Sequence, residues 1–176
     1  IIFGIEHNLD QAAGNFVNGF GNEIMTSSYS GIFGVNNNVS GSTRAYVFGN
    51  SNTVTDASGI VTGSNNQIDG FCAVTLGFHN VVIANYGVAI GESNETLQIY
   101  AVACGNKTSA QGRNSFTSGR HTSDISGYET VFGSYNTLYN GSAVGWTALD
   151  RLFVIGNGTS NTQRANAFTV LKNGDI

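Results

Sequence analysis

Residues 45–66 read AYVFGNSNTVTDASGIVTGSNN, and this stretch contains one short pattern twice. An apolar run ends at a glycine, Gly49 or Gly63, and an asparagine follows three residues later, Asn52 or Asn66. The pattern is typical of a strand that ends at a tight corner and is followed by a second, shorter strand.

The same pattern extends along most of the chain. Glycines that follow an apolar run recur at a regular interval, which is one position longer in the first three repeats than in the later ones. These glycines are Gly4, Gly19, Gly34, Gly49, Gly63, Gly77, Gly91, Gly105, Gly119 and Gly133. Most of them have an asparagine three residues later, namely Asn22, Asn37, Asn52, Asn66, Asn80, Asn94 and Asn136.

Both columns have a physical explanation. Glycine supplies a positive φ or lets two backbones approach closely, and asparagine tolerates the left-handed region. A 14-residue unit is too short for a hairpin with its own core, but stacked units can pair each strand with its equivalent about 4.8 Å away. The sequence therefore predicts an all-β parallel solenoid of about ten coils, roughly 45–50 Å long, with a stacked ladder of asparagine amides.

The apolar run before each glycine does not alternate with polar residues. Tyr46-Val47-Phe48 and Val88-Ala89-Ile90 are apolar throughout, whereas a strand with one wet face alternates. We expect one face inside the coil and the other against further copies of the chain around a rotation axis. The residues expected in the core or at the subunit contact are Val47, Phe48, Val61, Leu76, Ile90, Cys104 and Phe132.

The returning segment of each coil has a different composition. Residues 40–43, 55–58 and 111–114 are rich in small and polar side chains. We expect these segments to be solvated, so that Ser42→Asp would be tolerated while Val47→Asp would abolish assembly.

Two runs resemble a known repeat. Gly87-Val88-Ala89-Ile90-Gly91 with Asn94, and Tyr46-Val47-Phe48-Gly49 with Asn52, resemble the head repeat of YadA-like trimeric autotransporter adhesins, and the 14-residue period matches. In that family each chain forms a left-handed parallel β-roll, and three rolls pack around an axis. The resemblance covers about residues 1–145 and implies a homotrimeric adhesive head.

The period breaks after Gly133, where we expect the roll to give way to a cap or neck over residues 146–176. Residues 152–159 and 164–176 resemble a β segment of phage tail fibres and bacterial surface fibres that often precedes a self-cleaving intramolecular chaperone. The resemblance implies a natural chain that continues beyond Ile176. We expect short strands here, with the open end of the core closed by Trp146, Phe153 and Phe168.

Residues that could support catalysis or bind a metal are few. Charged residues make up 10% of the chain. His7, His79 and His121 have no partner at metal-ligand spacing. The carboxylates, including Glu92 and Glu95 at one corner and Asp56 and Asp69 on adjacent return strands, are expected to be solvated, with a weak Ca²⁺ site as the alternative. No arrangement of Ser, His and Asp marks a nucleophile, so we expect no enzyme, no cofactor and no metal.

The two cysteines are expected to be free thiols. Cys72 and Cys104 lie two units apart and in different columns, so they should be roughly 10 Å apart. A disulfide needs Cα atoms within about 7 Å. Cys104 is expected to be buried as a small hydrophobic residue.

One column provides a candidate ligand surface. Five residues before successive glycines stand Tyr29, Arg44, Ser58, Cys72, Tyr86, Tyr100, Asn114 and Tyr128, and the candidate ligand residues among them are Tyr29, Arg44, Tyr86, Tyr100 and Tyr128. One interpretation is that the aromatic rings support neighbouring coils, and the other is that the strip contacts a glycan or protein. A second set of side chains falls on adjacent units and predicts either a solvated patch or a receptor site: Lys107, Arg113 and Arg120.

These features predict an extracellular adhesive fibre module, on a bacterial surface through an outer-membrane anchor elsewhere, or in a phage tail fibre as the alternative. Its expected partners are its own copies and a host glycan or extracellular protein. The net charge of −4 gives no electrostatic reason to bind nucleic acid, and no apolar run is long enough to span a membrane. Enzymatic solenoids have other periods, and an ice-binding solenoid is less favoured because the threonines form no sustained column.

Overall fold

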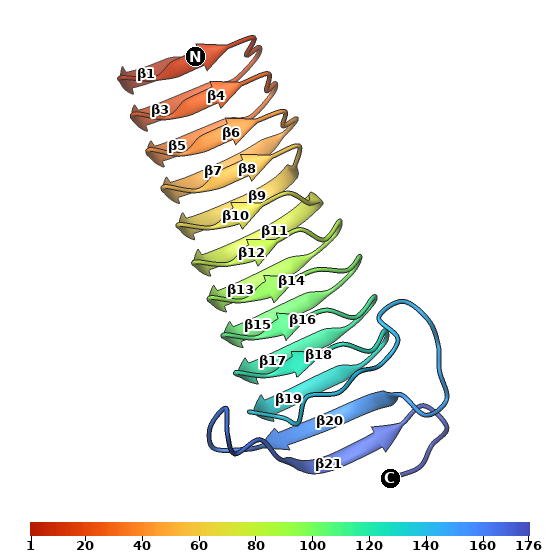
Figure 1. Cartoon of the computed structure of the whole chain (residues 1–176). Coiled ribbons are helices and arrows are strands. Elements are labelled where there is room, and N and C mark those ends of the chain that lie inside the picture. The colour runs from red at the N-terminus through yellow and green to blue at the C-terminus, as the bar shows by residue number, and fades with distance from the viewer.

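The computed structural model describes all residues, 1–176, and contains strands but no helix. The coils stack into a straight column with the two termini at opposite ends (Figure 1). No helix capable of crossing a membrane is therefore present. The prediction of an all-β solenoid is confirmed, and its parallel coils repeat with the period of the glycines.

Two sheets run along the column (Figure 1). The twelve-stranded sheet consists of β1 (Ile2–Ile5), β3 (Phe16–Phe20), β5 (Gly31–Val35), β7 (Ala45–Asn50), β9 (Ser58–Ser64), β11 (Phe71–Phe78), β13 (Val88–Glu92), β15 (Val102–Asn106), β17 (Phe116–Arg120), β19 (Thr130–Ser134), β20 (Arg151–Asn157) and β21 (Asn166–Leu171). The nine-stranded sheet consists of β2 (Asn8–Asp10), β4 (Glu23–Met25), β6 (Asn38–Ser40), β8 (Thr53–Thr55), β10 (Gln67–Ile68), β12 (Val81–Val82), β14 (Glu95–Thr96), β16 (Ser109–Ala110) and β18 (Ser123–Asp124).

The repeated glycines lie directly above one another. Gly77 pairs with Gly91, and Gly91 pairs with Gly105, in parallel register. Gly91 has a φ of 118°, and a Cβ added to it would overlap the carbonyl oxygen of Gly105. The column therefore needs glycine both for its backbone conformation and for the close approach of successive coils.

In each long strand, the side chain two residues before the glycine points into the coil. Val47 and Val61 lie there, fully buried, in the same column as Val17 and Ile32. The short strands meet them with a second inward column, which contains Ile24, Val39, Val54, Ile68 and Val82. Around β15 and β16 the inward side chains are smaller, and Ala101, Ala103 and Ala110 form a separate small cluster. The long-strand column returns to valine at Val131 and Val154. The core is thus one side chain thick on each side.

Buried asparagines connect the coils. The Asn66 side chain donates to the Asn52 carbonyl oxygen Oδ1 at 2.9 Å and to the Gly77 carbonyl at 2.9 Å. Its own Oδ1 accepts from the Asn80 backbone at 3.0 Å. The side-chain bond from one asparagine to the next runs from Asn22 to Asn80. The bond to the glycine carbonyl of the next coil recurs at Asn22, Asn37, Asn52, Asn66, Asn80 and Asn94. At the end of this ladder Thr108 donates its hydroxyl to Asn94 at 2.6 Å.

The returning segments are not simply solvated, so the expectation for Ser42 is wrong. Ser42 and Ala57 are buried and point into the coil, and Gly112 is also buried. The Ser42 hydroxyl donates to the Ser40 carbonyl at 2.9 Å and accepts from the Ala57 backbone at 3.3 Å. A carboxylate at position 42 would lose solvation inside the coil, and Ser42→Asp is not a neutral change.

The shortening of the coil by one residue has a defined place in the structure. Ala13, Ser28 and Thr43 form isolated parallel bridges with one another. The next coil has no equivalent of this bridge position. Its Ala57 backbone bonds to Ser42, and its Gly59 pairs with Ala45, so Ser58 is the only residue opposite Thr43 and Arg44. The extra residue of the early coils is therefore one bridge position that later coils omit.

The long-strand sheet continues past the break in the period. β20 pairs in parallel with β19, and Gly156 lies opposite Gly133. β21 then pairs antiparallel with β20 and ends the sheet. The expected boundary after residue 145 falls in the loop between β19 and β20, which is drawn beside the stack in Figure 1.

The aromatic residues expected to plug the core do not do so. Trp146 is 61% exposed and packs on Tyr128 with ring centroids 5.8 Å apart. Phe153 lies between Phe132 and Phe168 on the outer face of the sheet, at 6.0 and 6.2 Å. Phe153 points outward because its neighbour in β20, Val154, points inward. Val154 is fully buried and fills the core at this level instead of an aromatic ring.

Candidate functional site

The outer face of the twelve-stranded sheet is the largest candidate surface. Residues one and three positions before each glycine point outward, on either side of the buried column. The exposed apolar side chains in these two positions include Phe3, Tyr46, Phe48, Ile60, Leu76, Ile90, Phe132 and Ile155. The face is therefore largely apolar from the first coil to β20, with Asn18, Thr62 and Ser118 as polar interruptions in the column next to the glycines.

Aromatic rings stack on this face at its N-terminal end. Phe16 and Phe33 have centroids 5.1 Å apart, and Phe33 and Phe48 have centroids 5.0 Å apart with nearly parallel planes. The rings follow the rise from coil to coil, so neighbouring strands hold one another's side chains in place.

The residues expected in the core or at the subunit contact separate into two groups. Val47 and Val61 are inside the coil. Phe48, Leu76, Ile90 and Phe132 are exposed on the outer face. Cys104 follows them in register, opposite Ile90, and is half-buried on that face. The expectation that Cys104 is buried as a core residue is therefore wrong, while the prediction that both cysteines are free thiols is confirmed. Burial raises the pKa of the Cys104 thiol.

The tyrosine column occupies one edge of the long strands. Tyr86 and Tyr100 lie on successive coils and stack at 5.0 Å. Tyr29 is 67% exposed and makes no ring contact with them. Tyr128 packs against Trp146 instead. Every member has a left-handed backbone, with φ between 55° and 66°: Tyr29, Arg44, Tyr86, Tyr100 and Tyr128. The column is thus a set of local contacts rather than one continuous aromatic strip.

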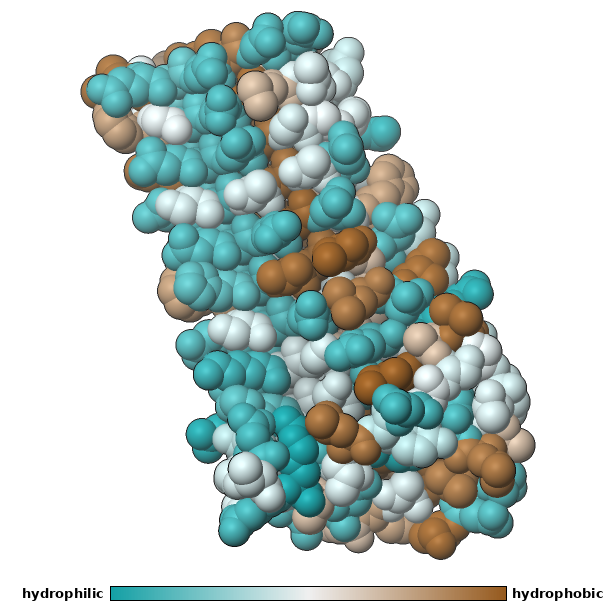
Figure 2. Space-filling model, in the orientation of Figure 1, coloured by the Kyte–Doolittle hydropathy of each residue, from teal (hydrophilic) through white to brown (hydrophobic).

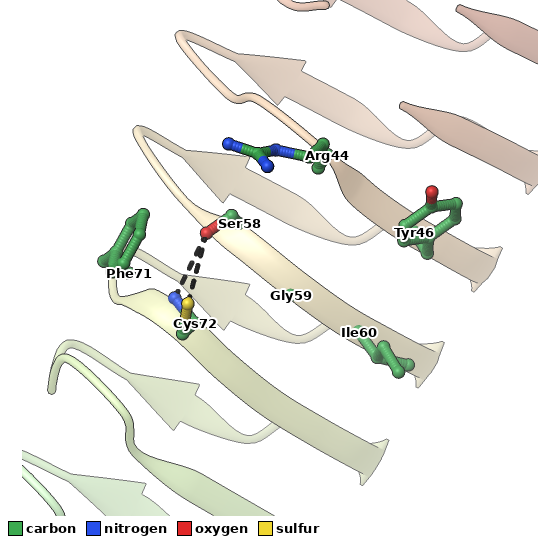
Figure 3. A pocket seen from close by; sticks show the side chains of 7 residues that line it. All are labelled: Arg44, Tyr46, Ser58, Gly59, Ile60, Phe71 and Cys72. Carbon is green, nitrogen blue, oxygen red and sulfur yellow. Dashed lines mark hydrogen bonds between the residues drawn. The ribbon is translucent and has the colours of Figure 1, made fainter. Parts of the chain in front are cut away.

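A groove opens where the coil length changes, between β7, β9 and β11 (Figure 3). Its volume is about 370 Å³. Arg44 and Tyr46 border it on one side and Phe71 and Cys72 on the other, while the small Ser58 and Gly59 form its floor (Figure 3). The Cys72 sulfur lies 3.7 Å from the Ser58 hydroxyl. The groove combines a guanidinium without a salt bridge with two aromatic rings, which suits a ligand that has both an anionic group and an apolar face.

The face shown in Figure 2 is mostly hydrophilic or neutral, with separate apolar patches across its middle and at its lower right. Several exposed apolar side chains belong to the loop between β19 and β20: Leu138, Val144, Trp146 and Leu149. No group of three or more His, Cys, Asp or Glu side chains gathers as a metal cluster.

Buried charges lie at the C-terminal end of the roll, where the sequence predicted solvated carboxylates. Asp124 lies inside the last complete coil and accepts hydrogen bonds from the Thr117 hydroxyl and, at 2.7 Å, from the Gly112 backbone. Burial raises the pKa of Asp124 to about 6, although these hydrogen bonds oppose the shift. The sequence contained a signal for the burial of Asp124, because this residue occupies the inward column that holds Val82 and Ala110 in earlier coils.

Two buried ion pairs join the loop and β20–β21 to the roll. The Arg151 Nε lies 2.8 Å from the Glu129 Oε1. Burial raises the pKa of Glu129 to about 7, with the Arg151 charge acting in the opposite direction. The Lys172 Nζ lies 3.8 Å from the Asp150 Oδ2 and donates to the Ser126 hydroxyl at 2.7 Å. These pairs lie inside the protein, so their role is to attach the cap.

The Asp150 carboxylate is held in its charged form. Burial alone would raise its pKa, but hydrogen bonds from the Ser142 backbone and the Tyr139 hydroxyl and the charge of Lys172 lower the pKa overall. The Ser142 amide donates at 2.9 Å and the Tyr139 hydroxyl at 3.1 Å. Asp150, the last residue before β20, thereby holds the loop residues Tyr139 and Ser142 in place.

No protein-family model, curated protein or solved structure matches this chain.

Proposed function

We propose that this chain is a structural and adhesive fibre module that assembles as a homotrimer through the outer face of its twelve-stranded sheet. The observation that supports the proposal is the largely apolar strip on that face, which only Asn18, Thr62 and Ser118 interrupt in the column next to the glycines. Twelve strands about 4.8 Å apart give a length of about 50 Å, and three residues give a width of about 10 Å. The footprint of about 500 Å² is at the upper end of what monomeric proteins leave exposed.

The geometry favours an axis that runs along the stack. Each rung presents the same two outward positions, so a rotation axis parallel to the column brings every rung against its counterparts in the other copies. Three copies is the number implied by the resemblance of the repeats to YadA-like heads. In such an assembly the column that contains Phe48 and Ile90 would meet its counterparts at the centre, and the nine-stranded sheet would remain outside.

The proposed role is attachment and display rather than catalysis. Four of the buried ionisable groups form the internal pairs Glu129–Arg151 and Asp150–Lys172, and the buried Asp124 accepts hydrogen bonds from Thr117 and Gly112 inside the coil. A stiff stack with a polar outer sheet serves to hold a recognition surface away from its anchor. This role fits a position outside the cell, on a bacterial surface or in a virion tail fibre, with a glycan or extracellular protein as the ligand.

The assembly can be tested by multi-angle light scattering. We expect the purified chain to have about three times the 18.5 kDa mass of one copy. Ile90→Glu places a charge on the apolar strip, and we expect this variant to be monomeric with an unchanged circular dichroism spectrum. Gln67→Glu introduces the same side chain on an exposed position of β10 and should remain trimeric. A wild-type monomer at tens of micromolar would refute the proposal.

A further inference from the structure

We propose that the corner formed by Lys107, Arg120, His121 and Arg164 binds the anionic groups of an acidic polysaccharide. The four side chains come from the ends of β15 and β17 and from the segment after β20. This inference rests on the proposed attachment role and names the chemistry of the ligand.

The positive charge of the chain is concentrated at this corner. The chain has seven Lys and Arg residues and a net charge of −4. Arg151 and Lys172 are held in the two salt bridges of the chain. Of the cations outside those salt bridges, Lys107, Arg120 and Arg164 lie close enough to His121 for all three charges to lower its pKa, after the larger effect of burial. Arg113, which the sequence placed with Lys107 and Arg120, lies instead at the opposite edge, one residue before the left-handed Asn114 of the tyrosine column.

The cationic side chains surround one aromatic ring. His121 stacks on Tyr135 with ring centroids 4.6 Å apart and an interplanar angle of 11°. The Arg120 and Arg164 guanidinium carbons lie 5.6 and 5.8 Å from the centre of the same ring. The tyrosine ring therefore holds two guanidinium groups and one imidazole together by cation–π contact and stacking.

Part of the site is rigid before any ligand binds. Arg164 donates to the carbonyls of His121 at 3.1 Å and Asn136 at 3.0 Å, and also to the Asn161 side chain at 2.9 Å. Lys107 and Arg120 are exposed and form no side-chain hydrogen bond or salt bridge. A fixed guanidinium beside two free cations reduces the ordering cost of binding an anion.

No acidic side chain neutralises the corner. The carboxylate in the register column of Arg120 is Glu92, two rungs away, with Asn106 between them. The Glu92 Oε2 accepts a hydrogen bond from the Asn106 side chain at 2.9 Å. The cations are therefore available to an external anion, and carboxylate or sulfate groups match the planar fork of arginine.

The shape of the corner favours a saccharide over a nucleic acid. Tyr135 is only 7% exposed, because His121 and the flanking residues cover it, so it presents no ring face on which a base could stack. The cations span three rungs, about 10 Å. This length fits a few charged sugar units but not the many phosphate contacts of duplex DNA.

The test measures binding of the full chain by calorimetry to four defined probes. These are a sulfated heparin hexasaccharide, a polygalacturonate hexamer, neutral maltohexaose and an oligothymidylate of similar length. We expect both acidic saccharides to bind, the neutral one not to bind, and the affinity to fall as salt is raised from about 50 to about 300 mM. A difference between the sulfated and carboxylated probes would identify which anionic group the site prefers.

Matched variants locate the site. Arg120→Gln and Lys107→Gln should each weaken binding by at least about fivefold, which corresponds to about 1 kcal/mol. Arg113→Gln removes the same charge from an exposed arginine elsewhere and should bind normally. Three results would overturn the inference. They are no binding of either acidic saccharide, a loss of affinity in Arg113→Gln equal to that in the corner variants, and tighter binding of oligothymidylate than of the saccharides. The mass of each sample by light scattering is recorded separately, so a failed trimer and a failed site are distinguished.

Discussion

At the scale of single residues, the fold depends on positions where the backbone leaves the usual regions. The repeated glycines have φ values between 101° and 141°. Ordinary residues such as Ser51, Asn65 and Lys107 adopt φ near 55° two positions after them. A left-handed residue costs about 1 kcal/mol or more, and the stacked coils maintain it because each corner is hydrogen-bonded to the corners of its neighbours. The Lys107 backbone, for example, donates to the Glu92 carbonyl at 2.8 Å.

Two glycine substitutions distinguish the cost of backbone strain from the cost of a steric clash between successive coils. Gly91→Ala adds a methyl group that would overlap the Gly105 carbonyl, so we expect a loss of at least about 3 kcal/mol of unfolding free energy. Gly174 also has a positive φ, 93°, but has open space around it. Gly174→Ala should therefore cost only about 1 kcal/mol of strain. Denaturant unfolding measures both variants, and equal losses would contradict the role of close approach.

At the scale of elements, the glycine period predicted the coils and their register, because every coil repeats the same corner. The period could not reveal β20, since the long loop after β19 hides Gly156 from a count based on that period. The sequence pattern also did not decide which side of the long strands faces the inside of the coil. A signal was available, because the column of Val17, Ile32 and Val47 contains no aromatic residue whereas the outward columns contain many. The narrow coil admits only small or β-branched side chains, and this physical limit distinguishes the two faces.

Single-residue deletions test which segments of a coil tolerate a change in length. Removing Thr43 shortens its coil to the length that later coils have, so we expect the solenoid to remain folded with a loss of no more than about 2 kcal/mol. Removing Phe48 shifts the strand by one residue and exchanges its inward and outward faces. Circular dichroism and urea unfolding should show a folded Thr43 deletion and an unfolded Phe48 deletion. Loss of structure in both would contradict the bridge assignment.

The C-terminal cap should respond to pH. The pKa of Asp124 rises from 3.8 to about 6, and that of Glu129 rises from 4.5 to about 7. Between these values the folded state binds more protons than the unfolded state, so its stability falls as the pH rises from about 4 to about 7. We expect amide hydrogen exchange in β19 and β20 to be faster at pH 8 than at pH 5, after correction for the intrinsic rate.

Asp124→Asn provides the control for this pH dependence. It keeps an acceptor for the Gly112 amide but cannot ionise, so the change in stability between pH 5 and pH 8 should become smaller. His121 acts in the opposite direction, because its pKa is lowered, and comparison with this variant removes its contribution. An unchanged pH dependence in Asp124→Asn would contradict the assignment of the effect to the buried carboxylate.

At the scale of the whole molecule, the interior and the exterior follow separate rules. Inside, the asparagine ladder and the valine column repeat with little variation until the core narrows to alanine near Ala103 and Ala110. Outside, one sheet face remains apolar while the basic corner near Tyr135 has its own composition. The fold therefore constrains the inward positions and leaves the outward ones free, which explains why the repeat predicted the architecture but not the composition of the surface.

The termini at opposite ends of the column give the molecule a particular response to tension. A force applied through residues 1 and 176 loads the hydrogen bonds between coils in series, so they open one coil at a time from the weaker end. β1 and β21 are the two edge strands of the long sheet, but only the β20–β21 end is anchored by buried ion pairs. Each released coil lengthens the chain by about 45 Å. A fibre built in this way would extend stepwise under flow and absorb mechanical work before its attachment fails.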